Sequence, residues 1–354
     1  MPIKFKSKIA CVALLLFGCN FVNAQEGAYS SYSPYSVFGM GDICRQGTVY
    51  NLSMGGTGIA SRNHRFINYL NPAAITARDT LSFMMDFGLV GEGKLYKQGD
   101  VKSASNLLNI SNVAFTVPIY KKSAFVAGIS PYSSMGYDFS HDITDPSLIG
   151  SVGNINYRSY GEGGVYQIFA GGAATFWNKL SVGAQFLYYF GNIDKSTIMN
   201  FSESSYRDVY SGYILNLNAI GGNFGVQYEQ ALPSGLSLTV GATYKTSSKL
   251  KGYVTDYKYA TVSSVTDTLK YKTDTLSHGS NVKLASEYGV GIALKKGDRW
   301  RAEFNYTRSD WRNSNLENVI GFANAGDAKF STTYSQSFRA GFEIVPNPND
   351  IRYY

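Results

Sequence analysis

The feature that most constrains this chain is a rhythm of alternating segments that begins near residue 80. Roughly ten stretches of period-2 alternation follow one another, and the gaps between them alternate between short and long. Between residues 236 and 245, for example, Leu, Val, Ala and Tyr alternate with Ser, Thr, Gly and Lys. Alternation of this kind gives a strand one apolar and one polar face. Short turns at one end and long loops at the other are typical of a transmembrane antiparallel β-barrel.

The composition also favours strands in a membrane. The 354 residues include 37 Gly, 28 Tyr and 21 Phe but only 16% charged residues, whereas a soluble domain carries about 25%. Tyr and Phe suit strands and the aromatic girdles at membrane interfaces. After residue 24 no apolar run approaches the roughly 20 residues that a spanning helix needs. The sequence therefore predicts an all-β protein of a Gram-negative outer membrane.

The N-terminus has the pattern of an export signal. Three lysines in the first eight residues precede an apolar stretch over 9–18, and small residues surround Ala24. This pattern predicts a signal peptide over residues 1–24. The alternative is a lipoprotein signal with Cys19 acylated, although Phe17 fits a lipobox poorly.

Charge and residue types exclude several functions. The net charge is +7, and the three signal lysines reduce it to 7 − 3 = +4 in the processed chain, so we expect no nucleic acid partner. The three histidines, His64, His141 and His278, show no ligand spacing, so we expect no metal and no cofactor. No Ser-His-Asp arrangement or nucleophile elbow is present, so the chain is not expected to be an enzyme. Outside the signal Cys44 stands alone, which excludes an internal disulfide.

Two regions follow the signal. Residues 25–79 are rich in Ser, Tyr, Gly and Asn and lack sustained alternation, which predicts a periplasmic tail or a plug inside the lumen. Residues 80–354 carry the strands. The chain ends just as an eleventh strand begins at 351–354, which predicts a C-terminally truncated barrel, because a free strand edge cannot lie in hydrocarbon. The alternative is that 351–354 are a tail and ten strands close the barrel.

The polar faces of the predicted strands carry residues of both charges and several amides. Because acidic and basic residues are mixed, we expect a packed or plugged lumen; the simpler alternative is solvated filler that pairs with the plug and selects nothing. The residues assigned to this lumenal face are Asp86, Gln185, Gln227, Glu229, Lys245, Glu287, Arg301, Glu303, Arg339 and Glu343.

The third predicted strand, about 123–137, contains Pro131. Proline cannot donate to a strand ladder, so we expect a kink, a bulge or a local break in pairing there. Three polar gaps predict long external loops: about 138–156, about 192–208, and some thirty residues after 245.

Two motifs carry a family resemblance. Residues 53–60 read Ser-Met-Gly-Gly-Thr-Gly-Ile-Ala, and residues 71–74 read Asn-Pro-Ala-Ala just before the first strand. Over about residues 35–80 the chain resembles FadL-like outer-membrane transporters, and it is also similar to the related shuttle barrel of type IX secretion. The resemblance implies a barrel of fourteen strands, about ten of them present here, plugged by an N-terminal hatch. The residues expected to hold the hatch backbone are Gly55, Gly56, Gly58, Asn71 and Pro72.

The resemblance also implies a function, passive uptake of small hydrophobic molecules such as long-chain fatty acids. The ligand would leave sideways into the membrane lipid through a break in the third strand. The candidates for this lateral opening are Ser130, Pro131, Tyr132 and Gly136; the alternative is a bulge that merely curves the wall. No basic residue that would bind a ligand carboxylate can be identified.

Two other functions remain open. The first is a non-transporting accessory or scaffold subunit of an outer-membrane assembly or secretion complex, with a surface lipoprotein or assembly machinery as partner. The second is a general porin. Uptake predicts an apolar pocket beneath the external loops near the hatch. A scaffold predicts a closed lumen and partner-binding loops, and a porin predicts an open aqueous path.

Overall fold

The computed structural model describes residues 31–77, 83–147, 149, 153–203, 205–262, 265–276, 281–322 and 330–346. The predicted signal peptide at 1–24 and the chain end at 347–354 lie outside the described residues.

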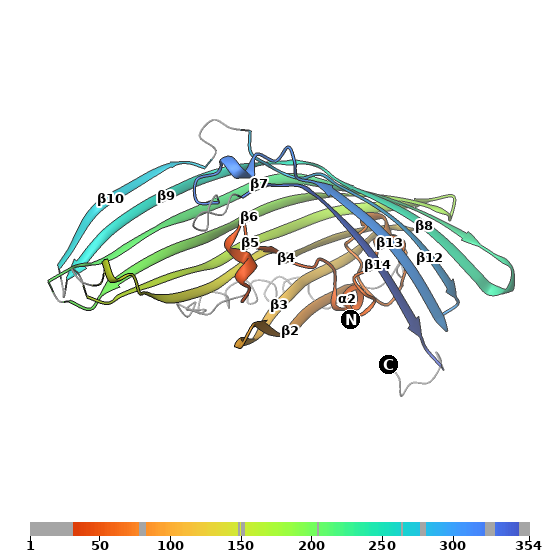
Figure 1. The fold of residues 1–354 in the computed structure, drawn as a ribbon. Helices are drawn as coiled ribbons and strands as arrows, with labels where there is room; N and C mark the ends of the chain where they lie inside the picture. Colours follow the sequence, from red (N-terminus) through yellow and green to blue (C-terminus); the bar gives the residue numbers. More distant parts are fainter. Residues whose placement is uncertain are drawn as a thin grey trace, which may run out of the picture.

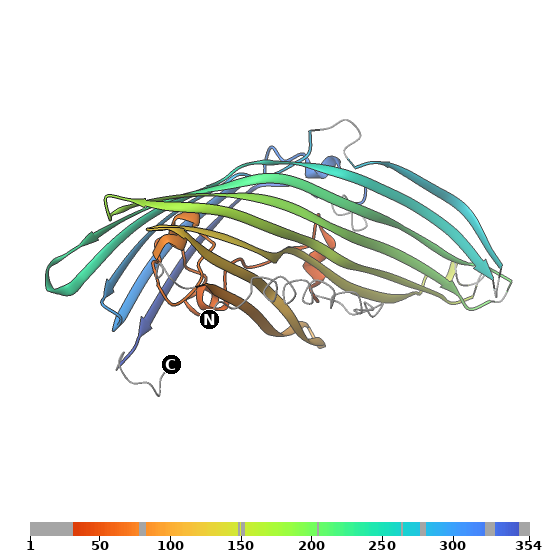
Figure 2. The ribbon, with the colours of Figure 1, turned by 180° about the vertical axis from the view of Figure 1, so that it is seen from behind.

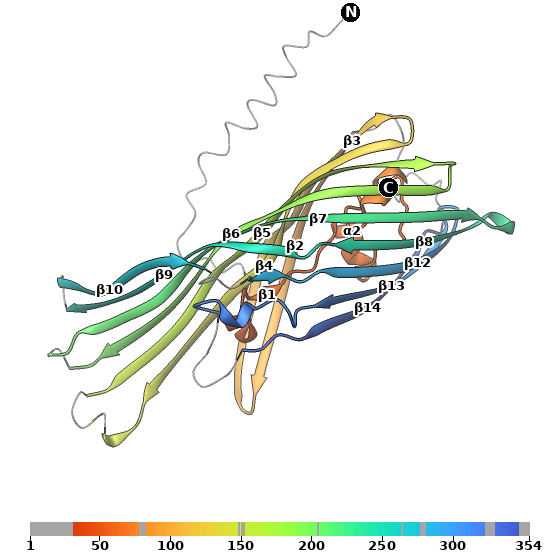
Figure 3. The same ribbon diagram turned by 90° about the horizontal axis from the view of Figure 1, so that it is seen from above.

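An antiparallel sheet dominates the molecule (Figure 1). Its main path runs in the order β14-β13-β12-β8-β7-β6-β5-β4-β3-β2, and consecutive strands along the chain mostly lie side by side. The sheet curls strongly, and seen from above its strands fan out toward opposite ends (Figure 3). The strands of this path are β2 (Met84–Gln98), β3 (Val101–Tyr120), β4 (Ser123–Ile143), β5 (Ile155–Phe176), β6 (Leu180–Phe201), β7 (Asp208–Ala231), β8 (Leu236–Lys245), β12 (Glu287–Lys296), β13 (Trp300–Asp310) and β14 (Tyr334–Ile344). The expected antiparallel all-β fold is confirmed.

The remaining strands extend this sheet. β7 pairs with β8 over its last residues and with β9 (Ser248–Val262) over its first ones. β10 (Val265–Thr275) pairs with β9, and the short β11 (Lys283–Leu284) pairs with the start of β9. The short β1 (Asp42–Ile43) pairs with β4. Among the described residues the sheet therefore contains four strands besides the ten of its main path. These ten agree with the roughly ten strands expected from the sequence.

The prediction of long external loops was wrong at three places. β4 and β5 run on to Ile143 and Ile155, β6 and β7 to Phe201 and Asp208, and the thirty residues after 245 form the ribbon β9–β10. Period-2 alternation marks a strand only where one face meets an apolar environment and the other a polar one. Beyond the belt the outward side chains are mostly polar, and only scattered inward ones such as Leu215 and Val254 are apolar and buried, so the pattern fades while backbone pairing continues.

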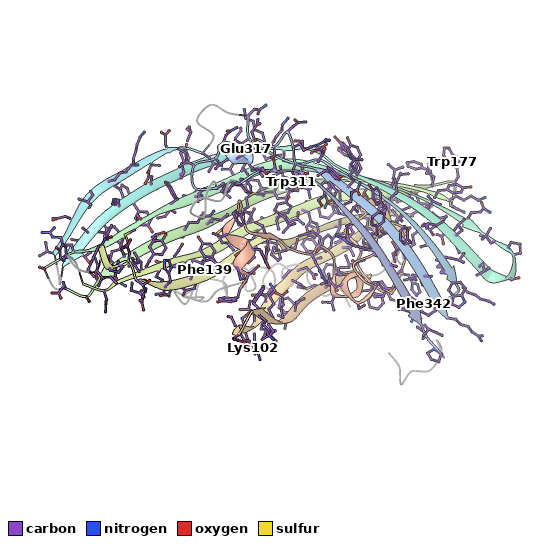
Figure 4. All side chains as sticks on the ribbon, in the orientation of Figure 1. Lys102, Phe139, Trp177, Trp311, Glu317 and Phe342 are labelled. Carbon is purple, nitrogen blue, oxygen red and sulfur yellow. The ribbon has the colours of Figure 1, made fainter. Side chains whose placement is uncertain are left out.

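An apolar belt covers the outward face near the short turns. On β2, Phe83, Met85 and Phe87 just before and within the strand are 61%, 65% and 57% exposed, while the intervening residues are more buried. The same alternation marks β6, where Val182, Phe186 and Tyr188 are exposed. Figure 4 places Trp177 at the short-turn end of the sheet and Phe139 toward the long ribbons. This belt fits contact with hydrocarbon.

The N-terminal segment, residues 31–77, lies against the concave face of the sheet (Figure 2). It contains short helical turns: η2 (Pro34–Val37), α2 (Val49–Ser53) and η3 (Pro72–Ala77). Two further turns, η4 (Pro233–Gly235) and η5 (Leu316–Asn318), connect strands. No helix among the described residues is long and apolar enough to cross a bilayer. Within the described residues no ladder joins β14 to β2, so the curled sheet is open between these edges.

Candidate functional site

A capping box folds the Gly-rich part of the N-terminal segment. Asn51 donates its backbone N–H to the hydroxyl of Thr48, while the Thr48 N–H donates to Asn51 Oδ1 at 3.1 Å. Asn51 Nδ2 then donates to the carbonyl of Thr57 at 2.9 Å. Because Thr48 and Asn51 are completely buried, these bonds replace water and fix the loop that follows α2.

The glycines predicted to hold the hatch backbone lie in this loop. Gly55 and Gly56 have φ angles of +69° and +78°, which side chains rarely adopt. A Cβ on Gly55 would lie 2.4 Å from the carbonyl oxygen of Ala340 on β14, and one on Gly58 would lie 2.7 Å from Asn51 Nδ2. Gly55 therefore brings the segment's backbone directly against the sheet.

Asn71 and Pro72 anchor the far end of the segment. Asn71 is fully buried, and its Nδ2 donates to the carbonyls of Ile59 at 2.7 Å and Val226 at 3.3 Å. Pro72 begins η3, which packs against β5, β6 and β7. Any side chain at Gly183 would collide with Pro72 at 2.5 Å, so the strand has a glycine where the segment touches it.

Six of the ten predicted lumenal residues bind the N-terminal segment: Glu303, Arg301 and Arg339, and also Glu343 through Tyr50 and Gln227 and Glu229 through Arg62. Glu303 on β13 accepts a hydrogen bond from the Ala60 N–H at 2.9 Å. Arg301 donates to the Tyr50 hydroxyl and lies 3.6 Å from the Glu343 carboxylate. Arg339 donates to the carbonyl of Gly56 at 3.4 Å. Each of these charged groups has a hydrogen bond or an ion pair within the protein, which is how charged groups are tolerated on strands away from bulk water.

Three further predicted lumenal residues, Asp86, Lys245 and Glu287, pair within the sheet. Asp86 accepts a hydrogen bond from Asn112 on the neighbouring strand β3. Glu287 lies 3.1 Å from Lys245 and accepts a hydrogen bond from Ser309. Their partners therefore come from adjacent strands, and these two carboxylates stabilise the wall itself.

Arg62 was missed by sequence reasoning, yet it is the centre of a polar cluster on this face. Its guanidinium is 3.1 Å from Glu229 and donates to Ser181 Oγ at 2.8 Å and Gln227 Oε1 at 3.0 Å. Glu229 also pairs with Lys295 at 3.0 Å. An isolated arginine in a segment without periodicity gives no sequence signal for a binding role. The only indication of a partner was that the facing strands carry hydrogen-bond acceptors such as Glu229 and Gln227.

The ladder between β3 and β4 ends beside Pro131. β3 and β4 pair from Tyr120↔Ser123 to Val113↔Ile129 and no further, while β3 continues along β2. The tip of the β2–β3 hairpin, marked by Lys102 in Figure 4, therefore diverges from the other long ribbons. The register of β4 with β5 shifts between Pro131 and Ser133, so the bulge predicted at the proline is present.

The N-terminal segment covers the edge of β4 where β3 departs. β1 pairs Ile43 with Ser133, and the Cys44 N–H donates to the Tyr132 carbonyl at 2.9 Å. The carbonyl of Gly136 accepts the Ser33 N–H at 2.7 Å. Backbone groups that a lateral opening would expose are thus occupied by the chain itself.

Gln46 completes this seam and was also missed from the sequence. Its Nε2 donates to the Pro131 carbonyl at 2.8 Å, and its Oε1 accepts hydrogen bonds from the Ser130 hydroxyl at 3.2 Å and from Gln167. The predicted lateral-opening residues Ser130, Pro131, Tyr132 and Gly136 are therefore brought together along one edge, and each contacts the N-terminal segment.

Two cavities among the described residues are candidate ligand sites. One of about 840 Å³ opens on the outward face, with Phe224, Tyr244 and Tyr288 among its lining residues. The other lies on the inner side near Arg65 and Asp298 and holds only about 30 Å³. Neither of these two is an apolar chamber between the N-terminal segment and the sheet. In the part of the chain that the structure describes, no group of three or more His, Cys, Asp or Glu side chains could hold a metal ion.

Comparisons with known proteins agree with this architecture. The structure is similar to CymD, a monoaromatic hydrocarbon channel, with a TM-score of 0.53, 14% identity, and coverage of 87% of this chain and 81% of that one. It is also similar to the toluene transporter TbuX of Ralstonia pickettii, with a TM-score of 0.52, 16% identity, and coverage of 84% and 82%. No curated protein sequence matches.

The chain therefore has the fold of FadL-like outer-membrane barrels, and the resemblance expected from its sequence is confirmed at the level of the fold. A family model described as BamG matches residues 6–354, and the chain belongs to the BamG family.

Proposed function

We propose that this protein is a non-transporting accessory subunit of an outer-membrane protein assembly or secretion complex. The observation that carries the proposal is the occupied inner face of the sheet. Ala60, Arg62 and Asn71 bond directly to strand residues. A hydrophobic molecule crossing this face would have to displace paired charges and buried amides, for which it offers no replacement hydrogen bonds.

The long ribbons outside the belt provide a surface for a protein partner. β10 pairs with β9 on one side, and its residues are almost all exposed, including Leu269 at 60% and Tyr271 at 71%. Exposed apolar and aromatic residues on a ribbon that projects from the membrane suit recognition of another protein.

Native purification in mild detergent tests this proposal. We expect the wild-type chain to carry a stoichiometric protein partner and the double variant Leu269→Asp with Tyr271→Asp to lose most of it while keeping its barrel fold. Tyr120→Asp, an equally exposed change at the short-turn end, is the matched control and should retain the partner. A wild-type protein that purifies alone would contradict the proposal.

The seam at β4 favours a second candidate, uptake of small hydrophobic molecules with lateral exit at the third strand. This candidate is supported by the fold shared with a hydrocarbon channel and a toluene transporter and by the ladder that stops at Ile129. In this case the segment around β1 must leave the β4 edge before a ligand can pass.

A disulfide across the seam separates the two candidates. Ile43 and Ser133 are cross-strand partners, so Ile43→Cys with Ser133→Cys, on a Cys44→Ser background, should form a bond that locks β1 onto β4. If lateral exit operates, oxidation abolishes hydrocarbon uptake and reduction restores it, whereas partner binding stays intact. Uptake that is absent, or unaffected by oxidation, would exclude this route.

A further inference from the structure

Four tyrosines gather on the outward face of the long ribbons, away from the N-terminal segment. They are Tyr160 on β5, Tyr210 on β7, and Tyr257 and Tyr259 on β9. The rings of Tyr210 and Tyr259 are stacked at 4.9 Å with an angle of 6° between their planes, and those of Tyr257 and Tyr259 lie 6.0 Å apart at 23°. Tyr160 belongs to the same cross-strand row as Tyr257. We call these four residues the tyrosine platform.

Polar groups frame the platform. Ser196 donates to Asp194 Oδ1 at 2.9 Å, so the Tyr257 hydroxyl, 2.5 Å from Ser196 Oγ, donates to the serine in turn. Gly212 makes room for this arrangement, because a Cβ there would lie 2.7 Å from the Tyr257 hydroxyl. Burial raises the pKa of the Asp194 carboxyl, which favours a ligand that can donate a hydrogen bond to it.

A second polar pair flanks Tyr160. Arg158 lies over the Tyr160 ring at 5.3 Å from its centroid and pairs with Asp138 at 2.6 Å. The platform therefore combines flat apolar ring faces with carboxylate, hydroxyl and guanidinium groups at its edges.

The contacts of Lys195 show that the platform faces outward. Lys195 Nζ donates to the Val37 carbonyl of the N-terminal segment at 2.8 Å and lies over the Phe322 ring, so it points to the concave side. Successive side chains of a strand point to opposite faces. Asp194 and Ser196, on either side of Lys195, must therefore point outward.

The platform lies too far from the apolar belt to be a membrane-interface girdle. On β6 the apolar belt ends at Phe190, because the next outward residues, Asn192 and Asp194, are polar, and Ser196 is six residues beyond Phe190. Six residues span about 20 Å along a strand, or roughly 15 Å along the membrane normal at a tilt near 40°. The interfacial layer of a bilayer extends only about 5–8 Å beyond the hydrocarbon.

We propose that the tyrosine platform binds the sugar units of a glycolipid of the outer leaflet. Aromatic faces pack against the apolar C–H faces of pyranose rings, and the surrounding carboxylates and Arg158 can bond sugar hydroxyls or phosphates. A membrane glycolipid is favoured over a soluble glycan because the platform lies directly above the apolar belt on the same face. Only a head group of several sugars reaches that height.

Binding of lipopolysaccharide that carries core sugars, compared with lipid A lacking them, tests the proposal on the full chain in detergent. We expect the core-bearing probe to bind at least about tenfold more tightly. The double variant Tyr210→Ala with Tyr259→Ala should remove this difference, whereas Tyr210→Phe with Tyr259→Phe should keep most of it because the ring faces remain. Tyr228→Ala, an exposed tyrosine near the short turns, is the matched control and should bind like the wild type.

Three results would overturn the proposal. Equal binding of the two probes would assign the affinity to acyl chains or phosphates, and an unchanged preference in the double alanine variant would exclude the platform. Free core oligosaccharide that competes as strongly as the intact glycolipid would exclude the membrane-anchored source. The thermal midpoint of each variant shows whether the barrel has kept its fold.

Discussion

Glu303 accepts a hydrogen bond from the backbone N–H of Ala60 at 2.9 Å, although 243 residues separate them in the sequence. The bond joins β13, near the end of the described sheet, to the Gly-rich loop of the N-terminal segment. Both groups are buried. This contact, together with those of Arg62 and Asn71, holds the segment on the inner face of the sheet. The docking of the segment can therefore be tested separately from the fold of the sheet.

We predict that Glu303→Leu loosens the N-terminal segment. The substitution leaves the Ala60 N–H buried without an acceptor, which costs about 1–3 kcal/mol. Glu303→Gln keeps an oxygen at the same place and should cost less. Limited proteolysis in detergent measures the effect as faster cleavage within residues 31–77. Equal cleavage of the Leu and Gln variants would show that the hydrogen bond does not hold the segment.

Gly55→Ala should destabilise the protein more than the same change at Gly99. Both glycines have positive φ angles, +69° and +59°, so both alanines carry a backbone penalty of about 1–2 kcal/mol. Only at Gly55 does the new Cβ meet an atom, the Ala340 carbonyl at 2.4 Å; at Gly99 nothing lies within 4 Å. Thermal midpoints of the two variants measure the difference. Similar midpoints would mean that the segment does not dock closely on β14.

A charge in the apolar belt should be costly only if that belt faces lipid. Phe224→Arg places a guanidinium on the outward face of β7 and should cost about 2–4 kcal/mol, with reduced insertion into vesicles. Tyr253→Arg, an exposed change on the ribbon β9, should cost much less. Folding yield in vesicles compares the two. Equal yields would contradict the membrane assignment of the belt.

We predict that the free energy of unfolding rises in mildly alkaline solution because of Lys195. This residue lies beyond the belt, and burial lowers the pKa of its ammonium from 10.5 to about 8. Between these values the unfolded chain holds a proton that the folded chain has lost, so the free energy of unfolding rises with pH from about 8 to 10.5. Below that range both states are protonated and this contribution stays constant.

The variant Lys195→Met should abolish that slope and stabilise the protein at neutral pH, because the methionine has no charge to bury. Lys251→Met, on an exposed lysine of β9, is the control and should leave the slope in place. Chemical denaturation at neutral pH and at two points across the alkaline range measures both. A slope that survives in the Lys195→Met variant would assign the effect to another group.

Much of the fold could be predicted from the sequence because its cause is local. Alternation at residues 180–190 indicated which side chains of β6 face lipid, and Pro131 marked a break in the ladder because proline lacks an N–H. The short turns at 121–122 and 177–179 also lie where expected. The ribbon β9–β10 was mistaken for a loop, because most of its side chains are polar or exposed and only a few, such as Leu250 and Val254, form a buried apolar face.

The sequence by itself determined the strands that carry the apolar belt, their lipid-facing sides and the glycine-rich turns, since each depends on neighbouring residues in a known environment. Only the tertiary structure decided that Arg62 meets Glu229 and that Gln46 meets Pro131, across 167 and 85 positions of the chain. These residues meet because the sheet curls around the N-terminal segment and brings distant parts of the chain together. Burial then makes each pairing necessary, because an unpaired polar group is costly once water has been removed.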